Sequence, residues 1–280
     1  MLTAQELKMQ PRDIEVKVSS GSTLARVSGQ PRRGTVLLLH ALGLDRLAFD
    51  GLRNALSDEW RLVSFDQLGH GALANVSDFK LSDFVLDAES VLERFAEGDL
   101  HILGHALGGS IAGMLASRLG VAKSLIGITT PSRGLPVFEA RANEALCHGM
   151  ESTLEPTFRR WFGQSADAEV AVARAYGKGC LLHMRPQGYA SAWRALASFE
   201  GYESIAARLP PFLCIAASDD LSTPPSHVEE IQAALARGGM RPSFHFEVAP
   251  EGGHMLPLVD PAYVARAALE HWINVGKHYV

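Results

Sequence analysis

The chain has 280 residues, of which 47% are hydrophobic and 20% are charged, and its formal net charge is −5 at pH 7. This composition provides ample core for one α/β domain with an inserted subdomain, and the mild acidity disfavours nucleic acid or an anionic membrane as the main partner. Apolar runs fall short of the roughly 20 residues that a membrane span needs, and three dispersed cysteines indicate reduced thiols in a cytoplasm.

In chain order, strands alternate with helices. Residues 1–8 lack the basic head and apolar core of a signal peptide, so a cytoplasmic location is expected. Strands at 14–18 and 24–27 flank a Ser-Gly turn, which predicts an N-terminal hairpin. The solidly apolar run at 35–40 predicts a parallel strand that is covered on both faces. Further strands are expected at 61–66, 124–129, 212–217 and 243–248, and another begins at 100.

Helices are expected between the strands, at 46–57, 82–96, 226–237 and 261–275. After Pro131 the alternation stops for about 80 residues, and this stretch predicts short helices at 138–150, 155–162, 168–183 and 188–199. The pattern predicts an α/β fold with a doubly wound, mostly parallel sheet and right-handed crossovers. We assign the core to 1–130 and 210–280. Residues 131–209 are predicted to form a helical cap, inserted after the sixth core strand over the C-terminal edge of the sheet.

Residues 100–109 predict a strand, a sharp turn and a helix around Gly-His-Ala-Leu-Gly at 104–108. This is the context of a nucleophile elbow, in which one side chain is held on a strained turn above a sheet. Glycines flank such a turn because the backbone must pass without Cβ clashes. A dinucleotide-binding loop is disfavoured, since G-x-G-x-x-G is absent. The nucleophile position is occupied by Ala106, whose methyl group cannot attack a carbonyl.

Two further motifs carry candidate catalytic groups. His254 follows the last expected strand, where a loop at the sheet edge can bring an imidazole base to the elbow. Asp220 directly follows an earlier strand, where a buried carboxylate would fix the imidazole tautomer. The adjacent Asp219 is a rival for this role, although the Asp-x-x-x-Pro spacing favours Asp220. The chain order of nucleophile, acid and histidine matches the order that follows such elbows.

The loop at 40–43, after the first long parallel strand, can turn a backbone N–H toward the elbow. We therefore assign an oxyanion hole to the amides of Leu42 and Leu107, the latter being the residue after the nucleophile position. His70 lies in a tight turn after the next strand, and we expect it to be structural rather than catalytic.

Together these motifs resemble the α/β-hydrolase superfamily across about residues 16–272. The resemblance rests on His-Ala-Leu-Gly at 40–43, Asp-Gln-Leu-Gly-His-Gly at 66–71, the elbow at 104–108, Asp-Leu-Ser-Thr-Pro-Pro at 220–225 and Gly-Gly-His at 252–254. It implies the hydrolase fold and a catalytic triad. Members of the superfamily carry serine where this chain has Ala106, and dehalogenase and epoxide-hydrolase relatives carry aspartate.

Within that superfamily, the cap segments 154–162 and 186–190 are similar to those of 3-oxoadipate enol-lactone hydrolases. This resemblance implies a small ester or lactone substrate that carries a carboxylate, with Arg160 and Trp161 as candidate substrate contacts. The other arginines that could clamp an anion are Arg133, Arg159 and Arg185. Each arginine could instead solvate the cap, and Trp161 could either line the pocket or hold the cap to the core. No metal or cofactor is expected, because ligand spacing such as H-E-x-x-H is absent.

The sequence thus predicts a serine-type ester or lactone hydrolase that works through an acyl-enzyme, in a form that lacks the nucleophile. Removing the serine of a triad costs on the order of 10⁶ in rate, so the chain is expected to be nearly inactive. One explanation is that alanine replaced a serine at position 106 as the smallest change that keeps the geometry of the turn, and the retained Asp220 and His254 favour it. The other is that the chain is a natural relative without hydrolytic activity, which binds a ligand or uses His254 as a lone base. A C–C bond hydrolase or amidase of the same fold is a further alternative. The sequence contains no indication of oligomeric state.

Overall fold

A computed structural model of the chain describes residues 10–56, 59–163, 165, 167–241 and 243–277. An eight-stranded sheet with the order β1-β2-β4-β3-β5-β6-β7-β8 forms its centre. The first two pairs in this order are antiparallel and the other five are parallel. The strands are β1 (Arg12–Val18), β2 (Gly21–Ser28), β3 (Thr35–Leu39), β4 (Arg61–Phe65), β5 (Leu100–His105), β6 (Ser124–Ile128), β7 (Phe212–Ala217) and β8 (Phe244–Ala249).

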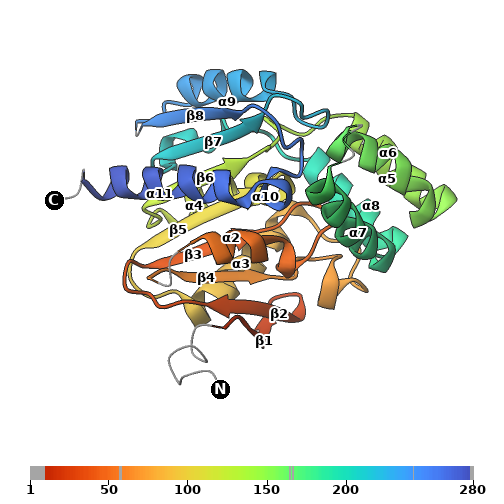
Figure 1. Cartoon of the computed structure of the whole chain (residues 1–280), viewed down its shortest axis with the longest axis horizontal. Coiled ribbons are helices and arrows are strands. Elements are labelled where there is room, and N and C mark those ends of the chain that lie inside the picture. Colours follow the sequence, from red (N-terminus) through yellow and green to blue (C-terminus); the bar gives the residue numbers. More distant parts are fainter. Residues whose placement is uncertain (1–9, 57–58, 164, 166, 242, 278–280) are drawn as a thin grey trace.

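Helices cover both faces of this sheet. The core helices and short turns are η1 (Arg46–Phe49), α2 (Asp50–Ala55), η2 (Gly71–Leu73), α3 (Leu81–Phe95), α4 (Leu107–Leu119), η3 (Ala206–Arg208), α9 (Ser226–Arg237), α10 (Leu256–Val259) and α11 (Pro261–Lys277). α2 packs on α11 on one face, and α3 packs on α4 on the other (Figure 1). Strands β3, β5, β6 and β7 are therefore buried at every position, as continuous apolar runs require. The predicted doubly wound α/β fold is confirmed.

The expected helix at 46–57 is divided in two. The Asp45 carboxylate accepts a hydrogen bond from the N–H of Leu47, which starts the 3₁₀ turn η1 before α2 begins at Asp50. An aspartate at such a position competes for local backbone donors and favours a tight turn over a regular helix start. The expected end at Ser57 lies outside the described residues, as do residues 1–9.

Four helices lie between β6 and β7 and form what we call the cap: α5 (Val137–His148), α6 (Met150–Phe162), α7 (Ala168–His183) and α8 (Pro186–Ala197). They gather at one end of the sheet (Figure 1). Gly149, with φ of 80°, separates α5 from α6. The helix expected to start at Glu155 starts instead at Met150, although Pro156 lies inside it. A proline disfavours a helix interior, but burial of Met150 and Thr153 holds the additional turn.

The cap sits over the loops that follow the parallel strands. A Cβ on Gly43, after β3, would come within 3.0 Å of the Trp161 ring and 2.8 Å of the Leu181 side chain. A Cβ on Gly69, after β4, would come within 3.0 Å of the carbonyl oxygen of Gly188. Both positions also have positive φ, +90° and +77°, which favours glycine. The C-terminal edge of the sheet is therefore enclosed between core loops and cap.

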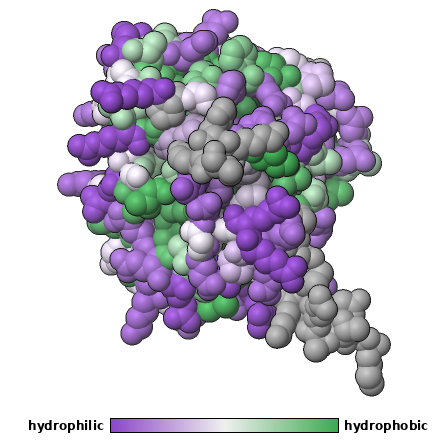
Figure 2. Space-filling model, turned by 90° about the vertical axis from the view of Figure 1, so that its left-hand side faces the viewer, coloured by the Kyte–Doolittle hydropathy of each residue, from purple (hydrophilic) through white to green (hydrophobic). Residues whose placement is uncertain are grey.

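The end of the molecule away from the cap is mainly hydrophilic, with smaller hydrophobic areas between the polar side chains (Figure 2). Such a mixture is normal for protein surfaces, because polar groups cannot cover a whole molecule. Within the described residues, no helix combines the length and apolarity needed to cross a bilayer.

The contact between α4 and β3 can be tested with one glycine. A Cβ on Gly108 would lie 2.0 Å from the Leu39 carbonyl oxygen, so we expect Gly108→Ala to lower the free energy of unfolding by about 1–3 kcal/mol or more through overpacking. Gly179, exposed on α7, has no atom within 4 Å of an added Cβ. The control Gly179→Ala should raise stability by about 1 kcal/mol. Urea unfolding measures both, and a neutral Gly108→Ala would contradict the close approach.

Candidate active site

Ala106 occupies the sharp turn between β5 and α4, with φ of 50° and ψ of −112°. Positive φ is unusual for a residue with a Cβ and marks local strain. The neighbouring glycines permit the turn, since a Cβ on Gly104 would lie 2.1 Å from the Gly108 carbonyl oxygen, and one on Gly109 would lie 2.5 Å from Thr130 Oγ1. The N–H of Ala106 donates to the Ile128 carbonyl at 2.9 Å. The backbone thus has the shape of a nucleophile elbow, with a methyl group at its apex.

His254 and Asp220 form a hydrogen-bonded pair. His254 follows β8 and Asp220 follows β7, and Nδ1 of the imidazole lies 2.9 Å from Oδ2 of the carboxylate. Asp220 is buried and also accepts hydrogen bonds from the Thr223 hydroxyl at 2.7 Å and the Thr223 N–H at 3.0 Å. A carboxylate on Nδ1 places the imidazole proton there. Nε2 then carries the free lone pair, and it has no hydrogen-bond partner among the described residues.

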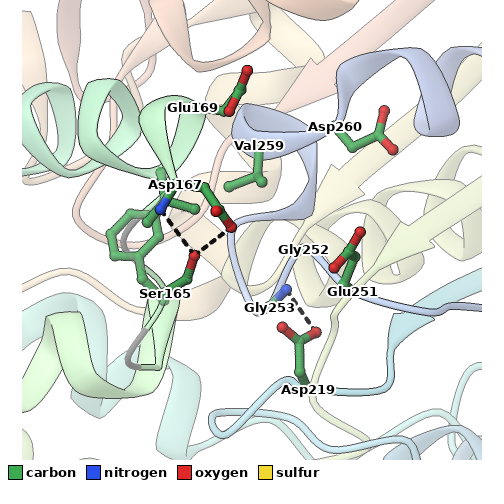
Figure 3. A pocket seen from close by; sticks show the side chains of 11 residues that line it. Ser165, Asp167, Glu169, Asp219, Glu251, Gly252, Gly253, Val259 and Asp260 are labelled. Carbon is green, nitrogen blue, oxygen red and sulfur yellow. Dashed lines mark hydrogen bonds between the residues drawn. The ribbon is translucent and has the colours of Figure 1, made fainter.

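The two adjacent acids have different partners. Asp219 accepts the N–H of Gly253 at 2.9 Å (Figure 3), so it holds the histidine loop without touching the ring. Burial raises the pKa of Asp220, but the charge of His254 and the hydrogen bonds from His254 and Thr223 outweigh burial and hold this pKa below its usual value. A buried carboxylate that stays ionised can stabilise an imidazolium.

The main chain of His254 is held from three sides. Its carbonyl accepts hydrogen bonds from His105 Nε2 at 2.8 Å and Thr129 Oγ1 at 3.1 Å, and its N–H donates to the Trp161 carbonyl at 3.1 Å. The rings of His105 and His254 lie 5.7 Å apart, which places the imidazole beside the elbow. Burial lowers the pKa of His105 to about 3, so this donor is neutral. The sequence pattern did not identify His105 and Thr129 as anchors, because each acts on the backbone of a distant loop. For Trp161 it left open whether the side chain lines the pocket or holds the cap to the core.

The two amides expected to form an oxyanion hole lie on neighbouring strand ends. Leu39 pairs with Gly104 in the β3–β5 register, so the loop after β3 lies beside the elbow. The Gly43 N–H donates to His70 Nε2 at 2.9 Å. By contrast, the N–H groups of Leu42 and Leu107 have no acceptor in the described part of the chain. Both residues are buried, and both amides are free to donate to a group outside the chain.

His70 supports the loop at 40–43 through a hydrogen bond to its backbone. Its Nε2 accepts the Gly43 N–H, its Nδ1 donates to the Leu68 carbonyl at 2.8 Å, and its ring lies 5.0 Å from the ring of His40. Burial, reinforced by the charge of His40, lowers the pKa of His70 to about 3. The imidazole is therefore neutral and able to accept. This geometry is the structural role that the sequence indicated.

Trp161 and Arg160 differ in what they contact. Trp161 is buried against Gly43, and its carbonyl accepts the His254 N–H, so it ties the cap to both candidate catalytic loops. Arg160 is half-buried, and its Nη2 donates to Thr157 Oγ1 at 3.0 Å. The other arginines suggested as anion clamps are exposed, which is typical of surface charges: Arg133, Arg159 and Arg185.

A cavity of about 560 Å³ opens beside the histidine loop, at the seam between cap and core (Figure 3). Its lining includes five carboxylates without an ion-pair partner among the described residues: Asp167, Glu169, Asp219, Glu251 and Asp260. Unpaired carboxylates create a negative potential that repels anions. Within the described residues, no cluster of three His, Cys, Asp or Glu side chains has a geometry that could hold a metal ion.

Residues 36–267 match the model of the alpha/beta hydrolase family. One relative, 3-oxoadipate enol-lactonase 1 of Acinetobacter baylyi, is 26% identical over 71% of this chain and 77% of its own length. Another, the (E)-2-((N-methylformamido)methylene)succinate hydrolase of the same organism, is 27% identical over 85% of this chain and 90% of its own length. Among solved structures, an enol-lactonase from Burkholderia xenovorans has a TM-score of 0.81 and 20% identity, covering 92% of this chain and 99% of the other.

The lowered pKa of Asp220 predicts a pH dependence of stability. Because the folded-state pKa lies below the ordinary 3.8, ionised Asp220 stabilises the fold above pH 3.8, and this contribution is lost as the pH falls through the lowered pKa. Asp220→Asn should therefore be less stable than the parent at pH 7, and the difference should shrink below pH 3.8. Denaturant unfolding across pH 2.5 to 7, approximately the range in which aspartates titrate, measures it.

Asp219→Asn is the matched control for this prediction. It leaves the contact between Asp220 and His254 intact, so the free energy of unfolding of this variant should fall at acid pH as it does in the parent. If both asparagine variants showed the same pH dependence, the assignment of the stabilising carboxylate to Asp220 would be wrong.

Proposed function

The chain belongs to the alpha/beta hydrolase family, and from that premise we propose that its site is built to hydrolyse a small carboxylic ester or lactone through an acyl-enzyme. The observation that carries the proposal is the free Nε2 of His254, which Asp220 orients beside the strained turn at Ala106. Unpaired amides at Leu42 and Leu107 add the donors that an oxyanion needs. These are the parts of acyl-transfer catalysis other than the nucleophile.

In a form with serine at position 106, the reaction has two steps. The serine oxygen bonds to the carbonyl carbon and its proton moves to Nε2 of His254, while Asp220 stabilises the imidazolium. The Leu42 and Leu107 amides hold the carbonyl oxygen as it becomes negative. His254 then protonates the leaving oxygen and the C–O bond breaks. In the second step, water gives a proton to His254 and its oxygen bonds to the acyl carbon. The bond between that carbon and the serine oxygen then breaks, and His254 returns the proton to the serine oxygen, which releases the acid and restores the serine.

Ala106 stops this sequence at its first step, because a methyl group offers neither a lone pair nor a proton. The cost of removing a triad serine is on the order of 10⁶ in rate, so we propose that this chain is a nearly inactive form. The retained Asp220–His254 pair and the strained backbone at position 106 favour the interpretation that alanine has replaced a serine there, which is the smallest change that keeps the geometry of the turn. A positive φ at an alanine costs free energy, so we do not expect it at a turn that has no catalytic role.

The relatives support the choice of substrate class. One is named as an enol-lactonase and another as the hydrolase of a substituted succinate, and both names describe small organic acids. We therefore propose a small carboxylated ester or lactone as the substrate. Hydrolysis of an amide or of a C–C bond in a substrate of the same size would use the same catalytic groups. Relative rates on matched ester, amide and ketone substrates separate these bond types.

Ala106 itself favours a second candidate function, the binding of a ligand without hydrolysis. A protein of that kind retains its ligand and shows no turnover even after a serine is introduced. His254, with a free Nε2, could in that case also serve as a lone base.

Restoring the nucleophile tests the first candidate. We expect Ala106→Ser to raise the hydrolysis rate by several orders of magnitude, up to about 10⁶, on 4-nitrophenyl butyrate and on 3-oxoadipate enol-lactone. The reason is that serine would be the only missing part of the proposed triad. Initial rates for both proteins, measured by absorbance on each substrate, provide the comparison.

Adding His254→Ala to Ala106→Ser is the control, and it should return the rate to that of the parent. A folded Ala106→Ser protein that remains as inert as the parent on both substrates would refute acyl transfer and favour ligand binding. A larger gain on a ketone or amide analogue would instead move the proposal to C–C or amide hydrolysis.

A further inference from the structure

The two edges of the sheet differ in what they expose. At the β1 edge the exposed positions are all charged: Arg12, Asp13, Glu15 and Lys17. Charged side chains are one way in which proteins keep an edge strand from pairing with another chain. At the opposite edge (Figure 1), no strand pairs with the outer side of β8 among the described residues. Its Phe246 and Val248 are 50% and 42% exposed, so this edge is protected less well.

The apolar face of β8 continues the core of the protein. Alternate residues of a strand share a face, so Phe244, Phe246 and Val248 lie on the same side of the sheet. Phe244 is half-buried, and its ring lies 5.4 Å from the ring of the fully buried Phe212. The two exposed side chains therefore extend a buried apolar layer to the open edge, where a further strand would cover them.

The backbone groups of β8 alternate between β7 and the open side. Two N–H groups of the β7 segment donate to the carbonyls of Ser243 and Ala249, at 3.0 and 2.9 Å. In a parallel pair the groups of every second residue face the neighbouring strand, so the odd-numbered residues of this segment face β7. The N–H and C=O groups of Phe244, Phe246 and Val248 therefore point away from β7. They form a regular row of unpaired donors and acceptors.

A second copy of the chain fits this row in one two-fold register. If two antiparallel β8 strands pair around Phe246, that residue faces its own counterpart, and Phe244 faces Val248 of the other copy. All three outward-facing residues then exchange backbone hydrogen bonds. A centre at Glu247 would set two carboxylates opposite each other, which destabilises a strand pair. A centre at His245 would set Val248 opposite a residue that precedes β8.

The side chains agree with the register around Phe246. His245 lies opposite Glu247 of the other copy, and the symmetry of the pair repeats this contact. These are non-hydrogen-bonded positions, where Cα atoms are only about 4.5 Å apart, and an imidazole N–H can donate to a carboxylate in either protonation state. On the other face the Phe246 rings meet, flanked by Phe244 and Val248. Aromatic and charge-complementary pairs of this kind both stabilise paired strands.

We propose that this chain forms a two-fold symmetric dimer through antiparallel pairing of its β8 strands, centred on Phe246. The two eight-stranded sheets then join into one continuous sheet, which removes the open edge of each copy. Contacts in which the same surface of each subunit meets itself are the commonest kind in soluble oligomers. Because the paired strands run in opposite directions, the two caps lie at opposite ends of the joined sheet. Dimer formation depends neither on hydrolysis nor on the residue at position 106.

Analytical ultracentrifugation of the full chain tests the dimer. At about 100 μM, where a dimer of micromolar affinity is mostly formed, the parent should have about twice the 30.2 kDa mass of the chain. Phe246→Asp sets two carboxylates at the centre of the strand pair and should be monomeric. Val172→Asp, at a residue of α7 that is 72% exposed, is the matched control and should stay dimeric. A monomeric parent, or a mass that keeps growing beyond the dimer, would overturn the proposal.

Two charge variants test the register. His245→Glu sets like charges opposite each other at two places, and Glu247→Lys removes the carboxylate that the imidazole meets. The dissociation constant of each variant alone should therefore rise by about tenfold or more. In an equimolar mixture the new carboxylate of one variant lies opposite the new ammonium of the other, so a tight dimer should form again. Unchanged dissociation constants, or a mixture that binds no more tightly than the variants alone, would contradict this register.

Amide hydrogen exchange separates strand pairing from any other contact between two copies. In the parent dimer, the N–H groups of Phe244, Phe246 and Val248 should exchange roughly tenfold or more slowly than in Glu247→Lys at a concentration where that variant is monomeric, because each is bonded to the other copy. The His245 N–H faces β7 and should be protected equally in both proteins. A dimer in which the three amides exchange as fast as in the monomer would place the contact elsewhere and overturn the proposal.

Discussion

The positive φ at Ala106 is the constraint on which the rest of the site depends. It turns the chain from β5 into α4 so sharply that Gly104 and Gly108 can carry no Cβ. It also brings α4 onto β3, whose register with β5 sets the loop at 40–43 beside the turn. The unpaired amides of Leu42 and Leu107 follow from this approach. Strain of about 1–3 kcal/mol at such a residue persists only where surrounding packing enforces it.

The cap completes this arrangement through backbone contacts. The Trp161 carbonyl holds the main chain of His254, and the Trp161 ring covers Gly43 in the loop at 40–43. One residue of the cap therefore touches both loops that we propose to act on a substrate. The cavity at the same seam is lined by carboxylates that have no ion-pair partner among the described residues. Their negative potential repels anions.

Much of the fold could be predicted because it depends on local patterns. Buried parallel strands are mostly apolar, and Gly-rich turns mark the elbow and the histidine loop. The strands of the sheet and the positions of Asp220 and His254 after β7 and β8 therefore follow from sequence. The start of α6 could not, since burial of Met150 overrides Pro156. Partners joined only in three dimensions, such as Trp161 with His254, leave no periodic signal.

The most direct test of the central claim, that position 106 is a nucleophile site served by His254, is covalent labelling. Ala106→Ser, treated with phenylmethylsulfonyl fluoride and analysed by intact mass and peptide mapping, should gain one sulfonyl adduct at position 106, and the addition of His254→Ala should abolish it. The parent should gain none there. A folded Ala106→Ser protein without the adduct would contradict the claim, because a serine on this turn would then lack either the exposure or the base that acyl transfer requires.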